Sequence, residues 1–258
     1  MTDPRALKMT YIGGPTVLIE FGGVKLLTDP TFDPAGSDYT TGPVTLSKTM
    51  GPALDAASLG KIDAVLVSHD HHFDNLDRSG HELLTKAGLV LTTPDGAERL
   101  GGNAVGLKHW EIIELAAPEG RILRVTATPA RHGPEGIENG PVIGFILQFA
   151  DAPGDAVYIS GDTVWYQGVE EIIKRFPIKT ALLFLGAARV SILPSHLTFT
   201  ADEAVKVAQA LPEATIVPAH FEGWKHFSES RDVITQTFAE AGLENRLHWL
   251  EAGRAVSL

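Results

Sequence analysis

The segment from Ala64 to Asp77 constrains this chain more than any other part of the sequence. It opens with a short apolar run, residues 64–67, which contains two β-branched valines and is typical of a buried strand. Five potential metal ligands follow within six residues: His69, Asp70, His71, His72 and Asp74. Imidazole nitrogens and carboxylate oxygens at this density, where a buried strand ends, suit a borderline-hard divalent metal. We therefore predict a metal site here, in preference to an ordinary solvated loop.

The composition limits which metal ligands and partners are available. The chain has 258 residues and no cysteine, so any metal must be held by histidine and carboxylate side chains. Hydrophobic residues make up 44% and charged residues 21%, which is an ordinary globular balance. The formal net charge of −11 repels phosphate backbones, and no basic stripe is interleaved with aromatic residues. We therefore predict no nucleic-acid partner.

No stretch of the sequence has the features of a membrane or secretion signal. The first five residues, Met1 to Arg5, lack the apolar centre of a signal peptide. No apolar run approaches the roughly 20 residues that cross a bilayer. We expect a cytoplasmic protein without a membrane partner.

Histidine or aspartate follows the end of a short buried strand at four places in the predicted structure. The four pairs are Val67 with His69, Thr128 with His132, Ser160 with Asp162, and Val217 with His220. If these strands lie side by side, their ends meet at one edge of a rigid sheet, where sites are usually built. Three or four converging donors are enough for one divalent metal, and a larger set leaves room for two.

The sequence also supports predictions for the structure of other segments and for the roles of Asp29 and His226. Residues 32–52 are rich in Gly, Pro, Thr and Ser without a clear period, so we expect a long functional loop that serves as a lid or a substrate wall. Residues 248–250 and 255–258 are expected to pair as a closing hairpin. Asp29 is expected to start a turn before Pro30, or alternatively to accept a hydrogen bond from a ligand histidine. His226 is either a residue that touches substrate or an ordinary, partly buried histidine.

The ordered motifs resemble those of the metallo-β-lactamase superfamily, in particular its branch of stand-alone hydrolases that includes the ascorbate-phosphate lactonases. The resemblance covers nearly the whole chain and rests on the motifs at residues 11–20, 27–30, 68–77, 132, 161–163 and 218–220. It implies the fold class: an α/β protein, built as an αββα four-layer sandwich of two mixed sheets with helices outside. It also implies a single domain over residues 1–258.

The signature loop departs from the usual His-x-His-x-Asp-His pattern of that family. An extra residue lies between Ser68 and Asp74, and no single register restores the pattern. We anchor the register at Asp74, which makes His72 a ligand and leaves His69 or Asp70 to share the first ligand position. His71 is then expected to point away from the site. Asn75 occupies the position of the last histidine, and Gly14 stands where this branch often carries another.

The resemblance implies a role for each candidate residue. His72 and His132, with His69 or Asp70, hold the first metal, while Asp74 and His220 hold the second and Asp162 bridges the two. Asp74 and Asp162 are the expected catalytic residues, because Asp74 can orient a water molecule or take its proton. One or two divalent ions are expected, zinc first, with manganese and iron as alternatives.

The predicted function is a metal-dependent hydrolase. A water that loses its proton near neutral pH beside a metal is expected to attack a small-molecule lactone, ester, amide or phosphodiester. The alternative is a catalytically weak or inactive metal-binding sensor or partner module on the same scaffold, which Asn75 and the extra loop residue favour. The partner is then a small-molecule substrate, and assembly into a homo-oligomer remains open.

Overall fold

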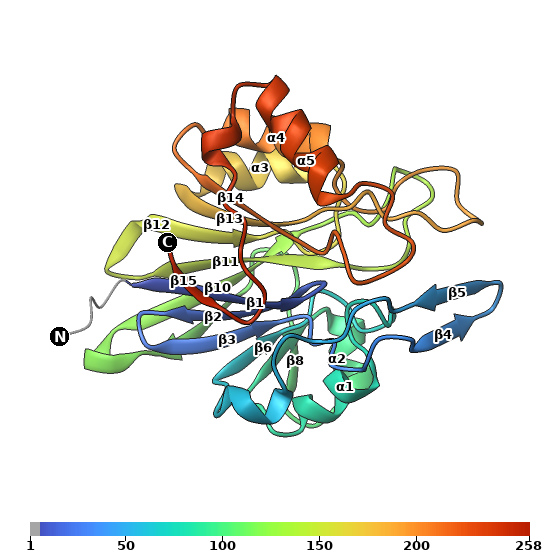
Figure 1. Ribbon diagram of the computed structural model, residues 1–258. Helices are drawn as coiled ribbons and strands as arrows, with labels where there is room; N and C mark the ends of the chain where they lie inside the picture. Colours follow the sequence, from blue (N-terminus) through green and yellow to red (C-terminus); the bar gives the residue numbers. More distant parts are fainter. Residues whose placement is uncertain (1–5) are drawn as a thin grey trace.

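Two β-sheets pack face to face, and helices cover the outer face of each (Figure 1). These elements come from a computed structural model that describes residues 6–258. Within these residues, one sheet has seven strands in the order β15-β1-β2-β3-β6-β7-β8, and the other has six in the order β14-β13-β12-β11-β10-β9. This arrangement confirms the predicted αββα sandwich.

The first sheet begins as an antiparallel meander and continues as parallel strands. Its strands are β1 (Leu7–Gly13), β2 (Thr16–Phe21), β3 (Val24–Thr28), β6 (Ala64–Leu66), β7 (Val90–Thr92), β8 (Ala104–Gly106) and β15 (Ala255–Ser257). The turns at Gly13-Gly14 and Gly22-Gly23 allow the meander, because these glycines have positive φ angles. The switch to parallel pairing starts between β3 and β6 and continues through β8.

The second sheet has the reverse order, with antiparallel strands first along the chain and parallel strands later. Its strands are β9 (Ile112–Ala116), β10 (Ile122–Pro129), β11 (Ile143–Phe149), β12 (Ala152–Ile159), β13 (Ile178–Phe184) and β14 (Thr215–Ala219). The pairs β12–β13 and β13–β14 are parallel. Their carboxyl ends therefore lie at the same edge of the sheet, as the sequence prediction required.

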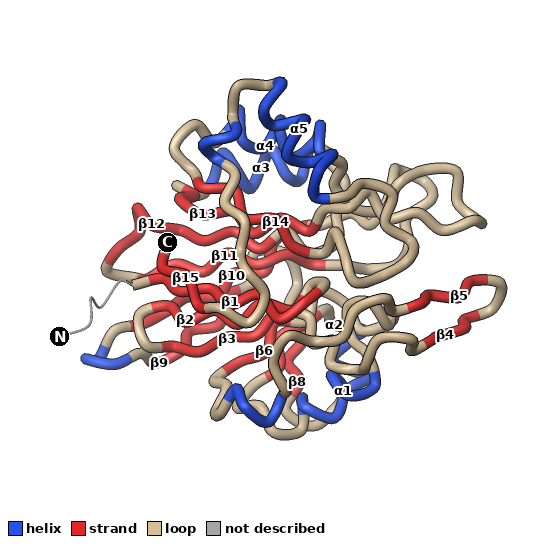
Figure 2. Tube along the Cα trace, viewed as in Figure 1, coloured by secondary structure: helices blue, strands red, loops and turns tan. Residues whose placement is uncertain are grey.

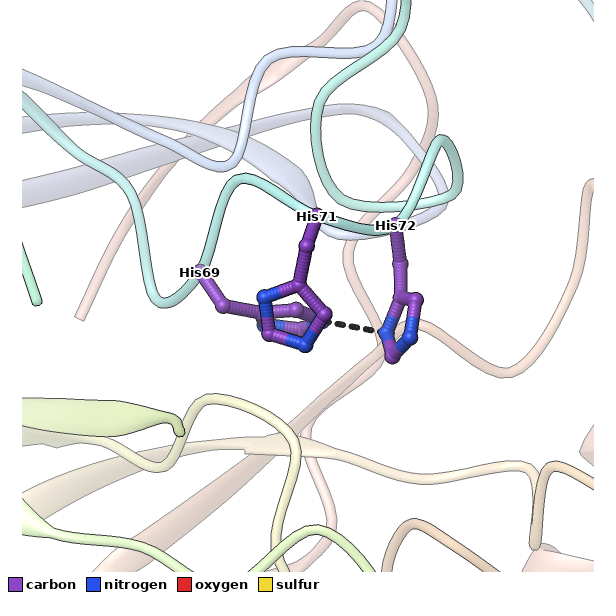
Figure 3. A group of neighbouring side chains, drawn as sticks. All are labelled: His69, His71 and His72. Atoms are coloured by element: carbon purple, nitrogen blue, oxygen red, sulfur yellow. Dashed lines mark hydrogen bonds between the residues drawn. The ribbon is translucent and has the colours of Figure 1, made fainter. Parts of the chain in front are cut away.

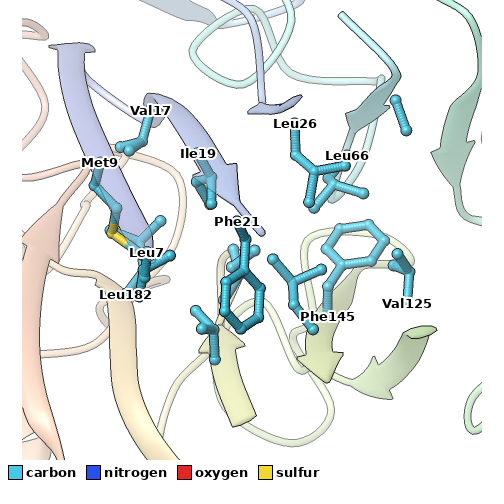
Figure 4. Close-up of a cluster of buried hydrophobic side chains, with 14 of the residues drawn as sticks. Leu7, Met9, Val17, Ile19, Phe21, Leu26, Leu66, Val125, Phe145 and Leu182 are labelled. Atoms are coloured by element: carbon cyan, nitrogen blue, oxygen red, sulfur yellow. The ribbon is translucent and has the colours of Figure 1, made fainter. Parts of the chain in front are cut away.

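The main hydrophobic core lies between the two sheets (Figure 4). Met9, Ile19 and Leu66 of the first sheet and Phe145 and Leu182 of the second belong to one cluster, and each is fully buried. Removing this apolar surface from water contributes about 25 cal/mol per Å² and holds the sheets together. The packing fixes which strand ends face each other at the edge of the sandwich.

The helices close the two outer faces of the sandwich (Figure 2). They are α1 (Arg78–Leu84), α2 (Pro94–Leu100), α3 (Gln167–Arg175), α4 (Ala201–Ala210) and α5 (Arg231–Glu240), with short 3-10 turns at Ala56–Leu59, Pro118–Gly120 and Glu244–Arg246. Helices α3, α4 and α5 bury their apolar residues on the second sheet, and α1 packs on the first. A capping box between Thr200 and Glu203 opens α4. Within residues 6–258, no helix combines the length and the hydropathy that a membrane crossing requires.

Two expectations about secondary structure are wrong. Residues 32–52 do not form an irregular loop throughout, because they contain the hairpin of β4 (Asp38–Thr41) and β5 (Val44–Ser47), which projects from the sandwich (Figure 1). Residues 248–250 do not pair with the last strand. Strand β15 instead adds to the free edge of β1, while Leu247 and His248 bond alongside β14. Both free sheet edges offered hydrogen bonds that a local hairpin would have left unused.

Candidate metal centre

The site lies where the ends of four strands meet between the two sheets. The loop after β6 brings His69, His72 and Asp74 from the first sheet. The ends of β10, β12 and β14 bring His132, Asp162 and His220 from the second. Ligand atoms of these residues fall into groups in which every atom lies within 4.8 Å of the others. The predicted convergence of distant segments is therefore present in the structure.

The first group consists of His69, His132 and Asp162, and all three are buried. The Nε2 atom of His132 lies 3.7 Å from Oδ2 of Asp162, and the rings of His69 and His132 are 5.2 Å apart. The Nδ1 atom of His132 donates a hydrogen bond of 2.9 Å to the carbonyl oxygen of Leu197. That bond assigns the proton to Nδ1 and leaves the Nε2 lone pair facing Asp162.

His69 is fixed by a chain of hydrogen bonds that begins at Asp29. Ser68 donates both its backbone N–H and its hydroxyl to Oδ1 of Asp29, each at 2.8 Å. The hydroxyl proton is then in use, so the Ser68 oxygen accepts from Nδ1 of His69 at 2.9 Å. The Nε2 lone pair of His69 is therefore the one available to a metal. Asp29 therefore orients a candidate ligand histidine through Ser68, and not by accepting directly from that histidine as the alternative expected.

His71 and His72 complete a histidine cluster with His69 (Figure 3). The Nε2 atom of His69 lies 2.9 Å from Nδ1 of His72, and the rings of His71 and His72 are 4.2 Å apart. His71 donates from Nε2 to the carbonyl oxygen of Asn139 at 3.0 Å, while its Nδ1 atom is buried without a partner. His71 does not point away from the site as expected, because its ring lies beside those of His69 and His72.

The second group consists of Asp74, Asp162 and His220. The Nε2 atom of His220 lies 3.5 Å from Oδ2 of Asp74 and 3.4 Å from Oδ1 of Asp162. His226 lies against the same carboxylate, with its Nε2 atom 3.0 Å from Oδ2 of Asp74. Asp162 therefore takes part in both groups, which is the position that a bridging ligand needs.

Burial and nearby charges shift the pKa values of the site histidines in opposite directions. Burial, reinforced by the nearby His132, lowers the pKa of His72 to about 3, and burial holds the pKa of His69 well below its usual value. Burial also opposes charge on His220, but the charges and contacts of Asp162 and Asp74 together outweigh burial and raise the pKa of His220 to about 10. A proton on His220 thus lies between two carboxylates, where a cation is favoured.

The backbone at the site is held in unfavourable conformations. His220 and Asp29 have φ angles of 53° and 26°, in a region that side chains other than glycine rarely adopt. The amide of His220 donates to the carbonyl oxygen of Gly14 at 2.7 Å, which stabilises the turn after β14. Strain of this kind costs on the order of 1–3 kcal/mol for each residue and concentrates at functional sites. The fold thus keeps His220 directed at the carboxylates at an energetic cost.

Asp70, a predicted ligand, and His196 lie outside the ligand groups. The carboxylate of Asp70 forms a bidentate ion pair with Arg99, at 2.6 and 2.8 Å, and belongs to none of the ligand groups. Since that pair occupies both of its oxygens, the structure brings His69 and not Asp70 into the first group. His196 lies 3.3 Å from Glu203 and contributes to the start of α4 instead of the site.

The sequence alone did not settle the roles of His226 and Asn75 at the site. His226 follows His220 by six residues, and its spacing alone did not distinguish a surface histidine from one that contacts Asp74. Asn75 was expected to be a poor replacement for a ligand histidine. Its amide donates to Oδ1 of Asp162 at 3.3 Å, which orients the shared carboxylate, and its own oxygen is buried without a partner.

The residues present fit a bound divalent metal. Among the described residues, several buried polar atoms at the site have no hydrogen-bond partner, and they include Oδ2 of Asp162 and both ring nitrogens of His220. Unpaired buried polar atoms are costly unless an ion or water satisfies them. Imidazole and carboxylate donors together suit zinc, manganese or iron. Metal binding by these residues accounts for an arrangement that would otherwise be unfavourable.

A cavity of about 210 Å³ opens beside the histidines and reaches the surface. Its polar side includes His72, Asp74, His132 and His226. Its opposite side is formed by the β4–β5 hairpin and by residues 188–197. A small molecule in this cavity contacts the candidate metal ligands directly.

Comparisons with known proteins agree with the fold and the site. The family model described as the beta-lactamase superfamily domain matches residues 25–221. The UPF0173 protein YddR of Bacillus subtilis is 26% identical over 260 residues, which cover 97% of this chain and 100% of that protein. A UPF0173 metal-dependent hydrolase of Pyrobaculum arsenaticum is 26% identical over 230 residues, or 83% of this chain and 84% of that one.

A solved structure has the same architecture. The isothiocyanate hydrolase from Delia radicum gut bacteria superposes with a TM-score of 0.81, at 22% identity, over 96% of this chain and 98% of that one. The family and the names of these relatives agree with the predicted enzyme class, a metal-dependent hydrolase. Since the matched model covers most of the sequence, from β3 to the residue after His220, the chain belongs to the metallo-β-lactamase superfamily.

Proposed function

We propose that this protein hydrolyses a small molecule at an electrophilic carbon, as in a lactone, ester, amide or isothiocyanate, with one or two divalent ions held by the two ligand groups. The observation that carries the proposal is the shared carboxylate of Asp162, which belongs to both groups next to the cavity. His69, His72 and His132 would hold one ion, and Asp74 and His220 the other, with zinc as the first candidate.

A bound divalent ion would supply Lewis acidity and lower the pKa of a bound water to about 7. The chain's own residues supply orientation and proton transfer. Asp74 stays ionised, because His226 and His220 offset its burial and hold its pKa well below the usual value, and its carboxylate is placed to orient a water molecule. His226, which lines the cavity beside Asp74, is placed to receive or return a proton.

Two features weigh on the choice of substrate bond. The isothiocyanate hydrolase that shares the fold supports carbon electrophiles, and the nematode relative named as an N-acyl-phosphatidylethanolamine-hydrolyzing phospholipase D supports phosphodiesters. The second relative is 24% identical, and the match covers 68% of its length. The alternative of a binding module without turnover draws on Asn75, but the contact of His226 with Asp74 supplies a further imidazole at that group.

The test combines metal analysis with a substrate panel. Protein purified without added metal is analysed for bound ions, reconstituted with zinc, manganese or iron, and assayed on lactones, esters, amides, isothiocyanates and phosphodiesters. We expect at least one bound ion per chain and turnover of a carbon electrophile. Asp162→Ala should lose both, whereas Asp70→Asn should keep both because Asp70 pairs with Arg99. Absence of metal and of turnover would reject the proposal, and metal without turnover would favour the binding module.

A further inference from the structure

The cavity beside the ligand groups is lined by both polar and apolar residues. Its apolar residues, referred to below as the apolar side, are Val44 and Leu46 of the hairpin, Phe73 of the loop after β6, and Val190, Ile192 and Leu197 of the segment after β13. Ile192 is 56% exposed although it is a large aliphatic residue. Exposed apolar surface that lines a cavity is a common sign of a binding site for an apolar group.

The lining also lacks a basic side chain that could pair with an anionic group of a substrate away from the candidate metal ligands. Among the described residues that line the cavity, none is lysine or arginine, and the charged side chain is the carboxylate of Asp74. The nearby basic residue Arg78 lies over the rings of Tyr39 and Phe73 and within 4.0 Å of Asp33, outside the lining. A phosphate or carboxylate group placed along the apolar side would therefore be desolvated without a charge partner, which is costly.

The apolar wall is held in place by buried contacts at the base of the hairpin. The ring of Tyr39 stacks on Phe73 with centroids 4.6 Å apart, and its hydroxyl donates to Asp33. Lys48, just after β5, forms a 2.8 Å ion pair with the buried Asp77. Because these contacts fix the wall before anything binds, little ordering cost remains for a ligand that fills the cavity.

We infer that the site selects uncharged substrates that carry an apolar group of about phenyl or hexyl size next to the bond to be cleaved. The reactive carbon would face His72, Asp74 and His132, and the apolar group would contact Leu46, Ile192 and Leu197. This inference rests on the proposed function for the reaction itself, but the apolar binding surface is a property of the chain with or without bound metal.

The first arm of the test measures occupancy of the cavity without any reaction. Protein with labelled Ile, Leu and Val methyl groups is titrated with benzyl alcohol by NMR, in metal-loaded and metal-free forms. We expect shifts at Val44, Leu46, Ile192 and Leu197 in both forms, but not at Ile112, an exposed residue on the edge strand β9. Absence of shifts at the cavity residues would overturn the inference, whether or not the protein proves to be a hydrolase.

The second arm measures selectivity at the metal-loaded site by calorimetry with three hydroxamates, which chelate metal through a common group. Phenylacetohydroxamate should bind roughly tenfold or more tightly than acetohydroxamate, because the ring is removed from water. Succinohydroxamate, which carries a carboxylate, should show no such gain. Leu46→Ser should remove most of the gain, and Ile112→Ser should leave it unchanged. Equal affinities for all three compounds would overturn the inference while leaving the proposed hydrolase intact.

Discussion

At the residue scale, the ring orientations of His69 and His132 are fixed by partners outside the ligand groups. Asp29 fixes Ser68, Ser68 fixes His69, and the carbonyl of Leu197 fixes His132. Such outer contacts hold the ring and select the nitrogen that faces the metal. The ligand groups thus depend on hydroxyl and carbonyl groups that cannot themselves reach the metal.

Replacing Ser68 by alanine tests this dependence. Ser68→Ala removes the hydroxyl that accepts from His69 and leaves Asp29 with fewer partners, so we expect metal affinity to fall about 10- to 100-fold. Affinity is measured by competition with a chromogenic chelator. Ser58→Ala, at an exposed serine that bonds to Asp55, is the matched control and should bind normally. An unchanged affinity in Ser68→Ala would show that His69 is oriented by packing alone.

The buried histidines give the metal-free protein a defined dependence on pH. Burial lowers the pKa of His69, His71 and His72 below the usual 6.5, and that of His72 to about 3. These rings stay neutral in the native state but gain protons in the unfolded chain as the pH falls below 6.5. Their contribution to stability is therefore full above pH 6.5 and is lost progressively as the pH falls. For His72 the loss continues toward pH 3, at about 1.4 kcal/mol per pH unit.

Urea unfolding of metal-free protein between pH 7 and pH 4 measures this effect. His72→Gln should reduce the slope of unfolding free energy against pH by about one proton. His81→Gln is the comparison variant, because His81 lies on α1 away from the ligand groups, and it should leave the slope as in the parent protein. Equal slopes in all three proteins would mean that His72 is protonated in the native state.

The residue types at the site followed from the sequence, but their exact partners did not. His132, Asp162 and His220 could be predicted because each follows a strongly apolar strand. The choice among Asp70, His71 and their neighbours depended on how the chain turns around the inserted residue. In the folded chain the carboxylate of Asp70 pairs with Arg99 of α2, outside the ligand groups, and local sequence does not reveal that α2 lies beside this loop.

At the scale of elements, the β4–β5 hairpin shows how buried charge positions a cavity wall. Asp77 accepts from the backbone amides of Phe32 and Asp33, caps α1 through Gly80, and receives the ammonium of Lys48. One carboxylate therefore joins the segment before the hairpin, the segment after it and the start of a helix. Sequence periodicity gave no sign of this hairpin, since each of its strands has only four residues, too few to establish an alternation.

Breaking the buried pair should cost far more than breaking an exposed one. Lys48→Met leaves the buried carboxylate of Asp77 without its charge partner, and we expect a loss of about 3–5 kcal/mol in unfolding free energy. Lys61→Met is the control, because Lys61 is 84% exposed and pairs with Asp63 at 3.4 Å, and it should change stability by about 1 kcal/mol or less. Urea titration of both variants compares them, and equal losses would contradict a structural role for the buried pair.

At the scale of the whole molecule, the ligands come from both sheets, so bound metal links the two layers. His69 and Asp74 belong to the first sheet, and Asp162 and His220 to the second. Metal bound to the native state alone stabilises it by about 4 kcal/mol when its free concentration is 1,000 times the dissociation constant. The two sheets and the outer helices were predicted from the resemblance to the metallo-β-lactamase superfamily, while the register between the layers depends on packing between residues far apart in sequence.

Removing metal should lower thermal stability. We expect chelation to reduce Tm by about 5 °C or more relative to the loaded protein, since the native state loses a ligand that joins its layers. Calorimetry of the loaded and chelated forms measures the change. Asp162→Ala should show little difference between the two conditions, and a parent protein whose Tm is unaffected by chelation would indicate that metal binds folded and unfolded chains equally.

The histidine cluster of Figure 3 has a consequence for the chain before it folds. His69, His71 and His72 lie within four consecutive positions, so an unfolded or newly made polypeptide already offers three imidazoles to a passing ion. Binding of a metal ion to these three histidines in the unfolded chain competes with binding to the folded protein. Because the unfolded state is then stabilised as well, metal raises the free energy of unfolding by less. An ion acquired early would also be present while Asp162 and His220 are still being delivered to it, and the loop could then be loaded before the sandwich closes.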